Sequence, residues 1–84
     1  MSWYLYIAEA RTGIYYTGIT TDPERRIKDH NRGKGSSLAR SQGPFTLLYT
    51  SGPLPDQSAA RKREIKVKGW SRKEKEELMR GEIT

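Results

Sequence analysis

The sequence contains no cysteine and a single histidine. Without cysteine the chain has neither a disulfide framework nor a thiolate zinc site, and one histidine argues against a zinc cluster. No apolar run approaches the ~20 residues that a membrane-spanning helix needs. Residues 1–4 include no basic segment before an apolar stretch, so no signal peptide is predicted. These absences are compatible with a cytoplasmic protein.

Hydrophobic residues are also scarce, at 33% of 84 residues. This length predicts one domain, 1–84, with a thin core to which tyrosine and tryptophan contribute much of the area. Sixteen Lys and Arg against ten Asp and Glu give a formal net charge of +6. An excess of positive charge favours a polyanionic partner, although charge alone fits a merely soluble basic protein equally well.

Two aromatic and β-branched segments, residues 3–9 and 14–20, predict a β-hairpin. If the loop between them comprises residues 10–12, Tyr6 lies opposite Tyr16 and both side chains share one face of the sheet. Gly18 removes a side chain beside them. That glycine either lets a phosphate backbone approach closely or marks a β-bulge.

A helix is predicted to begin after the hairpin and to run to about Arg32. Its start has two interpretations. Either Asp22 is the N-cap with Pro23 at the first helical position, or Thr21 is the N-cap and Glu24 completes a capping box.

The remaining segments complete an α/β fold of the α+β layered type. Residues 45–50 predict a third strand, residues 56–68 a helix, and residues 71–80 a last helix that opens with a capping box. Residues 38–42 predict a short helical turn. The expected architecture is a small three-stranded antiparallel sheet flanked by helices, in the order β-β-α-β-α-α.

Five polar residues stand out by their order and spacing: Tyr6, Tyr16, Arg26, His30 and Glu64. The first two lie in the two hairpin strands, the next two are one helical turn apart, and the last is the lone carboxylate of an Arg/Lys-rich helix. This pattern resembles the GIY-YIG nuclease domain, in particular its small stand-alone bacterial members, over residues 3–75. Tyr-Leu-Tyr replaces the first signature in such members, and Tyr-Thr-Gly-Ile-Thr-Thr-Asp is a familiar form of the second. The literal string at residues 13–15 is interpreted as a coincidence, because it adjoins the second signature.

The resemblance implies a metal-dependent nuclease in which Tyr6 activates the attacking water and Tyr16 assists. A guanidinium such as that of Arg26 can hold a phosphate through two parallel hydrogen bonds. An imidazole, with an ordinary pKa of ~6.5, suits the proton traffic expected of His30. Glu64 is the expected ligand of one Mg²⁺ or Mn²⁺ ion, since these hard ions accept one carboxylate plus waters and phosphate oxygens. Taken alone, a glutamate among cations is more often a solvated charge balancer.

The basic residues predict a nucleic-acid surface, with DNA favoured over RNA as the partner. Its expected members are Arg25, Lys34, Arg40, Arg61, Lys62, Arg63, Lys66 and Lys68. A protein partner that supplies specificity is a further expectation. Two other hypotheses remain open at this point: a binding module of the same fold with little activity, and a structural RNA or ribosome-associated protein. The chain also departs from many family members, with Ile19 in place of a lysine and no asparagine after Glu64.

Taken together, the hairpin parity and the shared helical face predict that the five polar residues converge on one concave surface.

Overall fold

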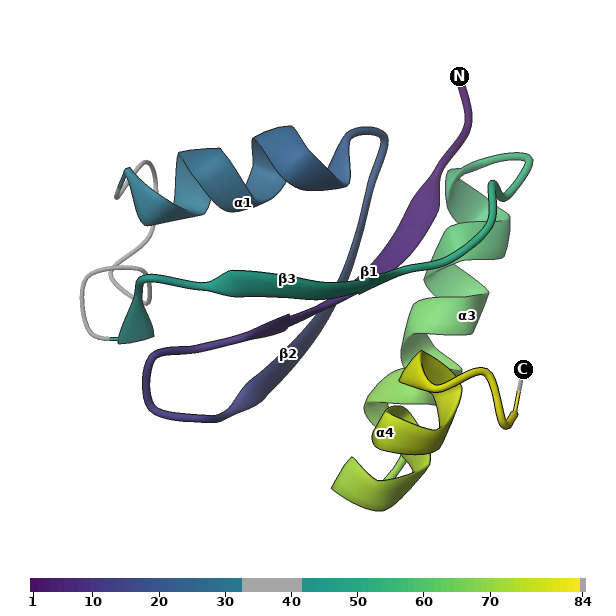
Figure 1. The fold of residues 1–84 in the computed structure, drawn as a ribbon. Coiled ribbons are helices and arrows are strands. Elements are labelled where there is room, and N and C mark those ends of the chain that lie inside the picture. Colours follow the sequence, from purple (N-terminus) through teal and green to yellow (C-terminus); the bar gives the residue numbers. More distant parts are fainter. Residues whose placement is uncertain (33–41, 84) are drawn as a thin grey trace.

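The computed structural model describes residues 1–32 and 42–83 (Figure 1). Its elements are β1 (Tyr4–Glu9), β2 (Tyr15–Thr20), α1 (Pro23–Asn31), β3 (Thr46–Thr50), α3 (Gln57–Lys68) and α4 (Arg72–Met79). The three strands form one antiparallel sheet in the order β2-β1-β3, which confirms the predicted fold class and element order. The helical turn predicted at residues 38–42 lies outside the described residues except for Gln42.

The β1–β2 hairpin has a three-residue loop, but one residue later than predicted. Ala10 N–H donates to the Ile14 carbonyl at 2.8 Å, and Gly13 N–H donates to the Ala10 carbonyl at 2.8 Å. Gly13 has φ 91°, a left-handed conformation that closes such a loop and that residues with a side chain adopt rarely. The loop is therefore residues 11–13. Consequently Tyr6 pairs with Gly18, and the predicted pairing of Tyr6 with Tyr16 is wrong.

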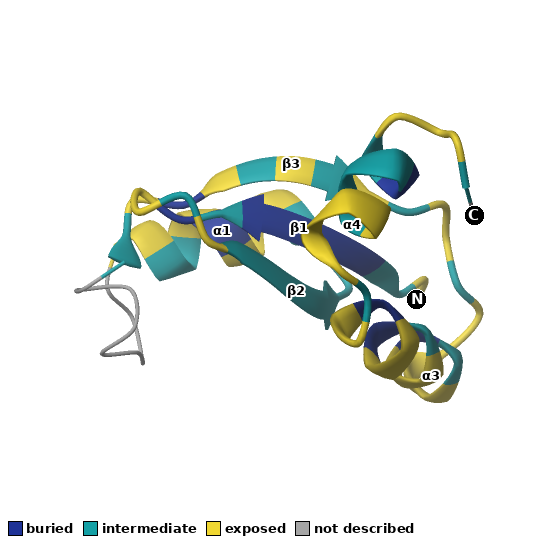
Figure 2. Ribbon diagram, turned by 90° about the horizontal axis from the view of Figure 1, so that it is seen from below, coloured by how far each residue is buried: buried dark blue, intermediate teal, exposed yellow. Residues whose placement is uncertain are grey.

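The sheet is a central layer with an apolar cluster on each face. Figure 2 shows its central strand, β1, mostly in the colour of buried residues. Alternate residues of β1 point to opposite faces, so this central strand is buried along most of its length. On one face its side chains pack with α1, in a cluster of Tyr6, Ala8, Ala10, Ile27 and Phe45. On the other face they pack with α3 and α4, in a cluster of Leu5, Ile7, Val67 and Leu78.

Because of a register shift, the short strand β3 contributes side chains to the clusters on both faces of the sheet. Tyr49 pairs with Ile7, and Leu47 pairs with Ala8, so Leu48 is the extra residue of a β-bulge. Leu47 packs against the α1 cluster and Tyr49 against the α3/α4 cluster, whereas Leu48 is exposed. Without the bulge, Leu47 and Tyr49, which are two positions apart, would lie on the same face of the sheet.

The helices begin at residues whose side chains accept backbone hydrogen bonds. Asp22 accepts from the Arg25 N–H at 3.3 Å and precedes Pro23, which selects the first of the two predicted starts. Asp56 caps α3, and Ser71 with Glu74 forms the predicted capping box of α4. Over the described residues, no helix has both the length and the apolar character needed to cross a membrane.

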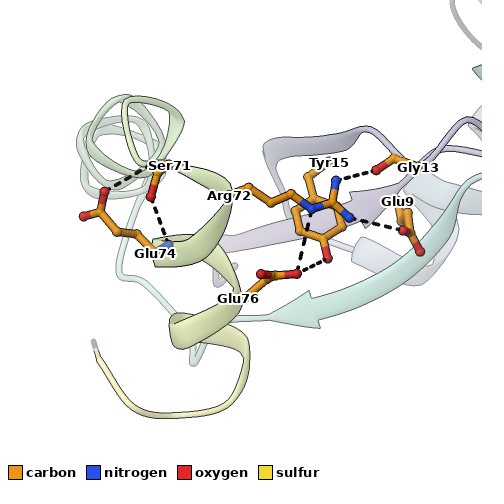
Figure 3. A network of polar contacts seen from close by, with 7 residues as sticks. All are labelled: Glu9, Gly13, Tyr15, Ser71, Arg72, Glu74 and Glu76. Atoms are coloured by element: carbon orange, nitrogen blue, oxygen red, sulfur yellow. Dashed lines mark hydrogen bonds and ion pairs between the residues drawn. The ribbon is translucent and has the colours of Figure 1, made fainter.

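Arg72 attaches the start of α4 to the hairpin (Figure 3). Its guanidinium lies 3.8 Å from the centre of the Tyr15 ring and donates to the Gly13 carbonyl at 2.7 Å. Glu9 and Glu76 each lie 3.8 Å from it, and the Tyr15 hydroxyl donates to Glu76 at 3.1 Å. Burial, together with this bond to Glu76, raises the pKa of Tyr15. Tyr15 is thus a neutral donor that holds α4, on the opposite face from Tyr16.

Candidate functional site

One cavity of about 320 Å³ opens between α1, the sheet and α3. The five polar residues singled out from the sequence all line it, together with the side chains that pack around them. The lining residues are Tyr6, Ala8, Tyr16, Thr17, Gly18, Ile19, Arg26, Ile27, His30, Phe45, Arg61, Glu64 and Lys68. The structure thus brings together residues that lie as far apart in the sequence as positions 6 and 64.

The ring of Tyr6 lies directly over Gly18. A methyl group at Gly18 would meet the Tyr6 hydroxyl oxygen at 2.6 Å and its Cζ at 2.7 Å, closer than real Cβ atoms come. The β1–β2 register runs without a bulge, so the interpretation of Gly18 as a β-bulge is wrong. Its missing side chain makes room for the Tyr6 ring, which is 8% exposed. The glycine therefore sets where the Tyr6 hydroxyl lies in the cavity.

Phe45 packs against two of the three other aromatic groups of the site. Its ring packs edge-on against Tyr16, with centroids 5.4 Å apart, and against His30, with centroids 5.6 Å apart. The side chain of Asn31 holds Phe45 in place: its amide donates to the Phe45 carbonyl at 3.0 Å and its oxygen accepts from the Phe45 N–H at 2.6 Å. Sequence reasoning missed Phe45, because ring contacts between residues 29 and 15 positions apart have no local signal.

His30 is held as a neutral imidazole. Burial, and then the positive charge of Arg26 one turn earlier, lowers the pKa of His30, against a smaller opposing effect of Asp29. Its Nδ1 is buried and has no hydrogen-bond partner among the described residues. A neutral imidazole beside a cation can accept a proton from a neighbouring group, which suits a role in proton transfer.

The protonation state of His30 can be measured directly, because His30 is the only histidine of the chain. Its imidazole C–H resonance should titrate below pH 6.5 in the folded protein and near 6.5 in urea, measured by proton NMR. Arg26→Ala should move the folded midpoint upward. Because the folded state binds this proton less tightly, the stability that depends on it is full above about pH 6.5 and is lost as the pH falls through the folded pKa. A folded midpoint above 6.5 would contradict this account.

Glu64 is the only buried charged residue among the described ones, at 6% exposed. Its Oε1 lies 3.3 Å from Nη1 of Arg61, and its Oε2 lies 3.3 Å from Nζ of Lys68. The two cations stand three residues before and four residues after it on α3, spacings that place side chains on one helix face. Sequence reasoning took both as nucleic-acid contacts only. The spacing itself was the signal that they also flank the carboxylate.

The residues present fit a hydrated divalent ion and do not fit a closed metal centre. Within residues 1–32 and 42–83, no group of three or more His, Cys, Asp or Glu side chains could hold a metal. A single carboxylate in a cavity large enough for water and phosphate matches the ligand habits of Mg²⁺ and Mn²⁺, which keep several waters. Glu64 is the group that would hold such an ion.

The residues predicted to contact nucleic acid lie in several different places in the structure. Arg61 and Lys68 line the cavity, and Lys62 and Lys66 are exposed on α3. Arg63 instead packs over the Trp70 ring, 5.3 Å from its centre, and lines a separate groove near the end of α4. Exposed Arg25 lies 4.0 Å from Asp29. Two further predicted contacts, Lys34 and Arg40, lie outside the described residues.

Comparison with known proteins identifies a family that the chain matches. The family model described as the GIY-YIG catalytic domain matches residues 2–77. The UPF0213 protein BH0048 of Halalkalibacterium halodurans is 46% identical over 79 residues, which cover 94% of this chain and 83% of that protein. The UPF0213 protein YhbQ of Escherichia coli K12 is 42% identical over 77 residues, covering 92% and 76% respectively.

Two solved structures resemble the fold. The solution NMR structure of BH0048 matches with a TM-score of 0.56, and the match covers 93% of this chain and 82% of the BH0048 chain. The solution NMR structure of EF2693 from E. faecalis is 34% identical, with a TM-score of 0.64, and covers 96% and 85%. The names of these relatives state no activity.

Proposed function

Because this chain belongs to the GIY-YIG catalytic domain family, a family of nucleases, we propose that it is a metal-dependent nuclease that hydrolyses phosphodiester bonds of DNA. The observation that carries the proposal is the composition of the cavity. Its lining combines three cationic side chains, Arg26, Arg61 and Lys68, with one buried carboxylate and two tyrosines. Such a site attracts a polyanion and offers groups that can move a proton.

The backbone phosphate is proposed to bind to Arg26. This residue is exposed on α1 at the cavity, and its planar guanidinium can bind two phosphate oxygens at once. In that position the guanidinium also opposes the negative charge that develops as the phosphate is attacked. Arg26 therefore both orients the substrate and stabilises the transition state.

Tyr6 is proposed to pass its hydroxyl proton to neutral His30 and then, as a phenolate, to take a proton from the attacking water, with Tyr16 in support. The new bond from the water oxygen to phosphorus forms as the bond to the 3′-oxygen breaks. The 3′-oxygen then takes a proton from a solvent water, so the products are a 5′-phosphate and a 3′-hydroxyl. A Mg²⁺ or Mn²⁺ ion on Glu64 would supply positive charge for the leaving oxygen. Since Tyr6 and Glu64 are both buried, solvent screens a charge on either of these two groups less than it screens the exposed cations of the site.

The proposal is tested by cleavage assays on single-stranded, double-stranded and branched DNA and on RNA, with Mg²⁺, Mn²⁺ or a chelator. Tyr6→Phe keeps the ring over Gly18 and removes only the hydroxyl, so the variant should fold and lose about 10² to 10⁴ in rate. Tyr4→Phe removes a hydroxyl from the same strand at a residue that is not among those lining the cavity, and should keep its activity. Equal activity of the two variants would exclude Tyr6 as the activating group.

The alternative function, a nucleic-acid-binding module with little activity, is favoured by one observation. Both carboxylate oxygens of Glu64 are already ion-paired, an arrangement that is also what a purely structural glutamate would show. A wild-type protein that binds DNA but cuts no substrate with either divalent ion would establish this alternative.

A further inference from the structure

The two cations that bind Glu64 belong to the wall of the cavity. Arg61 reaches one carboxylate oxygen and Lys68 reaches the other, each at 3.3 Å. The carboxylate is buried while the side chains of Arg61 and Lys68 are 58% and 56% exposed. The two cations therefore extend from a buried carboxylate to the solvent.

A divalent ion on Glu64 has to use the same oxygens. Carboxylates bind Mg²⁺ and Mn²⁺ through one or both oxygens, and here each oxygen is engaged by a positive group. A doubly charged ion is also repelled by two positive charges a few ångströms away. The protein without nucleic acid is therefore poorly arranged to hold the ion.

The same two side chains are well placed to leave the carboxylate when a phosphate arrives. Their stems are long, their head groups are more than half exposed, and both line the cavity in which the phosphate would lie. Guanidinium and ammonium groups bind phosphate oxygens through charge-assisted hydrogen bonds. A nucleic-acid backbone therefore competes with Glu64 for Arg61 and Lys68.

We propose that Arg61 and Lys68 keep divalent ions off Glu64 until a nucleic-acid backbone draws the two cations away. Ion and nucleic acid then bind cooperatively: each raises the affinity of the protein for the other by the same factor. This inference rests on the proposed function, because it takes Glu64 as the ligand of the ion. It assigns Arg61 and Lys68 a positioning role that simple phosphate contacts would not have.

Equilibrium binding of Mn²⁺, measured from the electron paramagnetic resonance signal of the free ion, tests the inference without relying on cleavage. Titrations are run with and without a saturating phosphorothioate DNA oligonucleotide, and binding to the oligonucleotide alone is subtracted. The variants are Lys68→Met, the double variant Arg61→Met with Lys68→Met, and Glu64→Gln. Lys73→Met is the matched control, since it removes one exposed lysine charge from α4.

In the wild type, the oligonucleotide should raise Mn²⁺ affinity by about fivefold or more. Lys68→Met should raise the affinity measured without oligonucleotide and shrink the effect of the oligonucleotide, and the double variant should do both more strongly. Lys73→Met should behave like the wild type. Circular dichroism checks that each variant is folded, which matters most for the double variant because it leaves the buried Glu64 without either cation.

Equal Mn²⁺ affinities in the double variant and in Lys73→Met would overturn the inference. If the wild type cleaves DNA while those affinities are equal, the proposed function stands and the cooperative binding falls. If Glu64→Gln binds Mn²⁺ as tightly as the wild type in the presence of the oligonucleotide, the ion lies elsewhere. The cooperative binding then falls, and with it the assignment of the ion to Glu64 in the proposed function.

Discussion

Glu64→Gln should abolish cleavage and leave DNA binding intact or slightly stronger. The substitution keeps the size of the side chain and removes the charge that would hold the divalent ion. Charge stabilisation by such an ion amounts to several kcal/mol, and about 1.4 kcal/mol is a factor of ten, so the rate should fall by about a thousandfold. Binding should persist, because one negative charge disappears from a cavity with three cationic side chains. Single-turnover cleavage and fluorescence anisotropy measure the two effects.

The folded state should tolerate this change. Arg61 and Lys68 lose their partner, but both head groups are more than half exposed and can be hydrated, so the free energy of unfolding should change by about 1 kcal/mol or less. Glu77→Gln removes a carboxylate from α4 at a residue that is not among those lining the cavity, and serves as the control. Cleavage that survives Glu64→Gln would show that the ion is held by another residue.

Gly18→Ala should impair both stability and cleavage. The added methyl group would lie 2.6 to 2.8 Å from three atoms of the buried Tyr6 side chain, so the rigid ring has to move. Overpacking of this kind costs about 1–3 kcal/mol. A displacement of about 1 Å in a catalytic group can lower the rate by about a hundredfold. Chemical denaturation and cleavage assays report the two losses.

Gly52→Ala is the matched control, since a methyl group there meets nothing within 4 Å and Gly52 has no left-handed conformation to maintain. A second variant separates crowding from other effects. Tyr6→Leu removes the atoms that would clash, so adding Gly18→Ala to it should cost much less stability than in the wild type. Equal costs in the two backgrounds would mean that Tyr6 is not the group that Gly18 accommodates.

Local signals predicted most of the fold. In the helix caps at Asp22, Asp56 and Ser71, the side chain of each residue accepts a hydrogen bond from the backbone N–H three residues later. Such local partners can be recognised in a short stretch of sequence. The hairpin register depended on where the loop closes, and the left-handed Gly13 shifted it by two positions. A shift of two leaves every side chain on the same face, which is why Tyr6 and Tyr16 still share the cavity.

The contacts across the cavity were less accessible to sequence reasoning. The packing of Phe45 on Tyr16 and His30, and the anchoring of Phe45 by Asn31, depend on how α1 crosses the sheet. Spacing along one helix, by contrast, would have revealed the ion pairs of Glu64 in advance. Residue types and periodicity indicate which side chains can belong to the site. Which residues of other helices and strands they contact is decided by tertiary packing.

The two-sided sheet makes the two halves of this small protein separable by mutation. Leu5 and Ile7 contact one helical layer, and Tyr6 and Ala8 contact the other, so neighbouring positions of a single strand belong to different cores. Substitutions that share no contacts add in their effects on stability. The face that carries the cavity is therefore open to redesign for another ligand while α4 stays attached through Arg72 and Tyr15 on the reverse face. The two halves are not separable in α3. There Glu64 lines the cavity, whereas Val67, one turn later, packs in the cluster on the reverse face of the sheet.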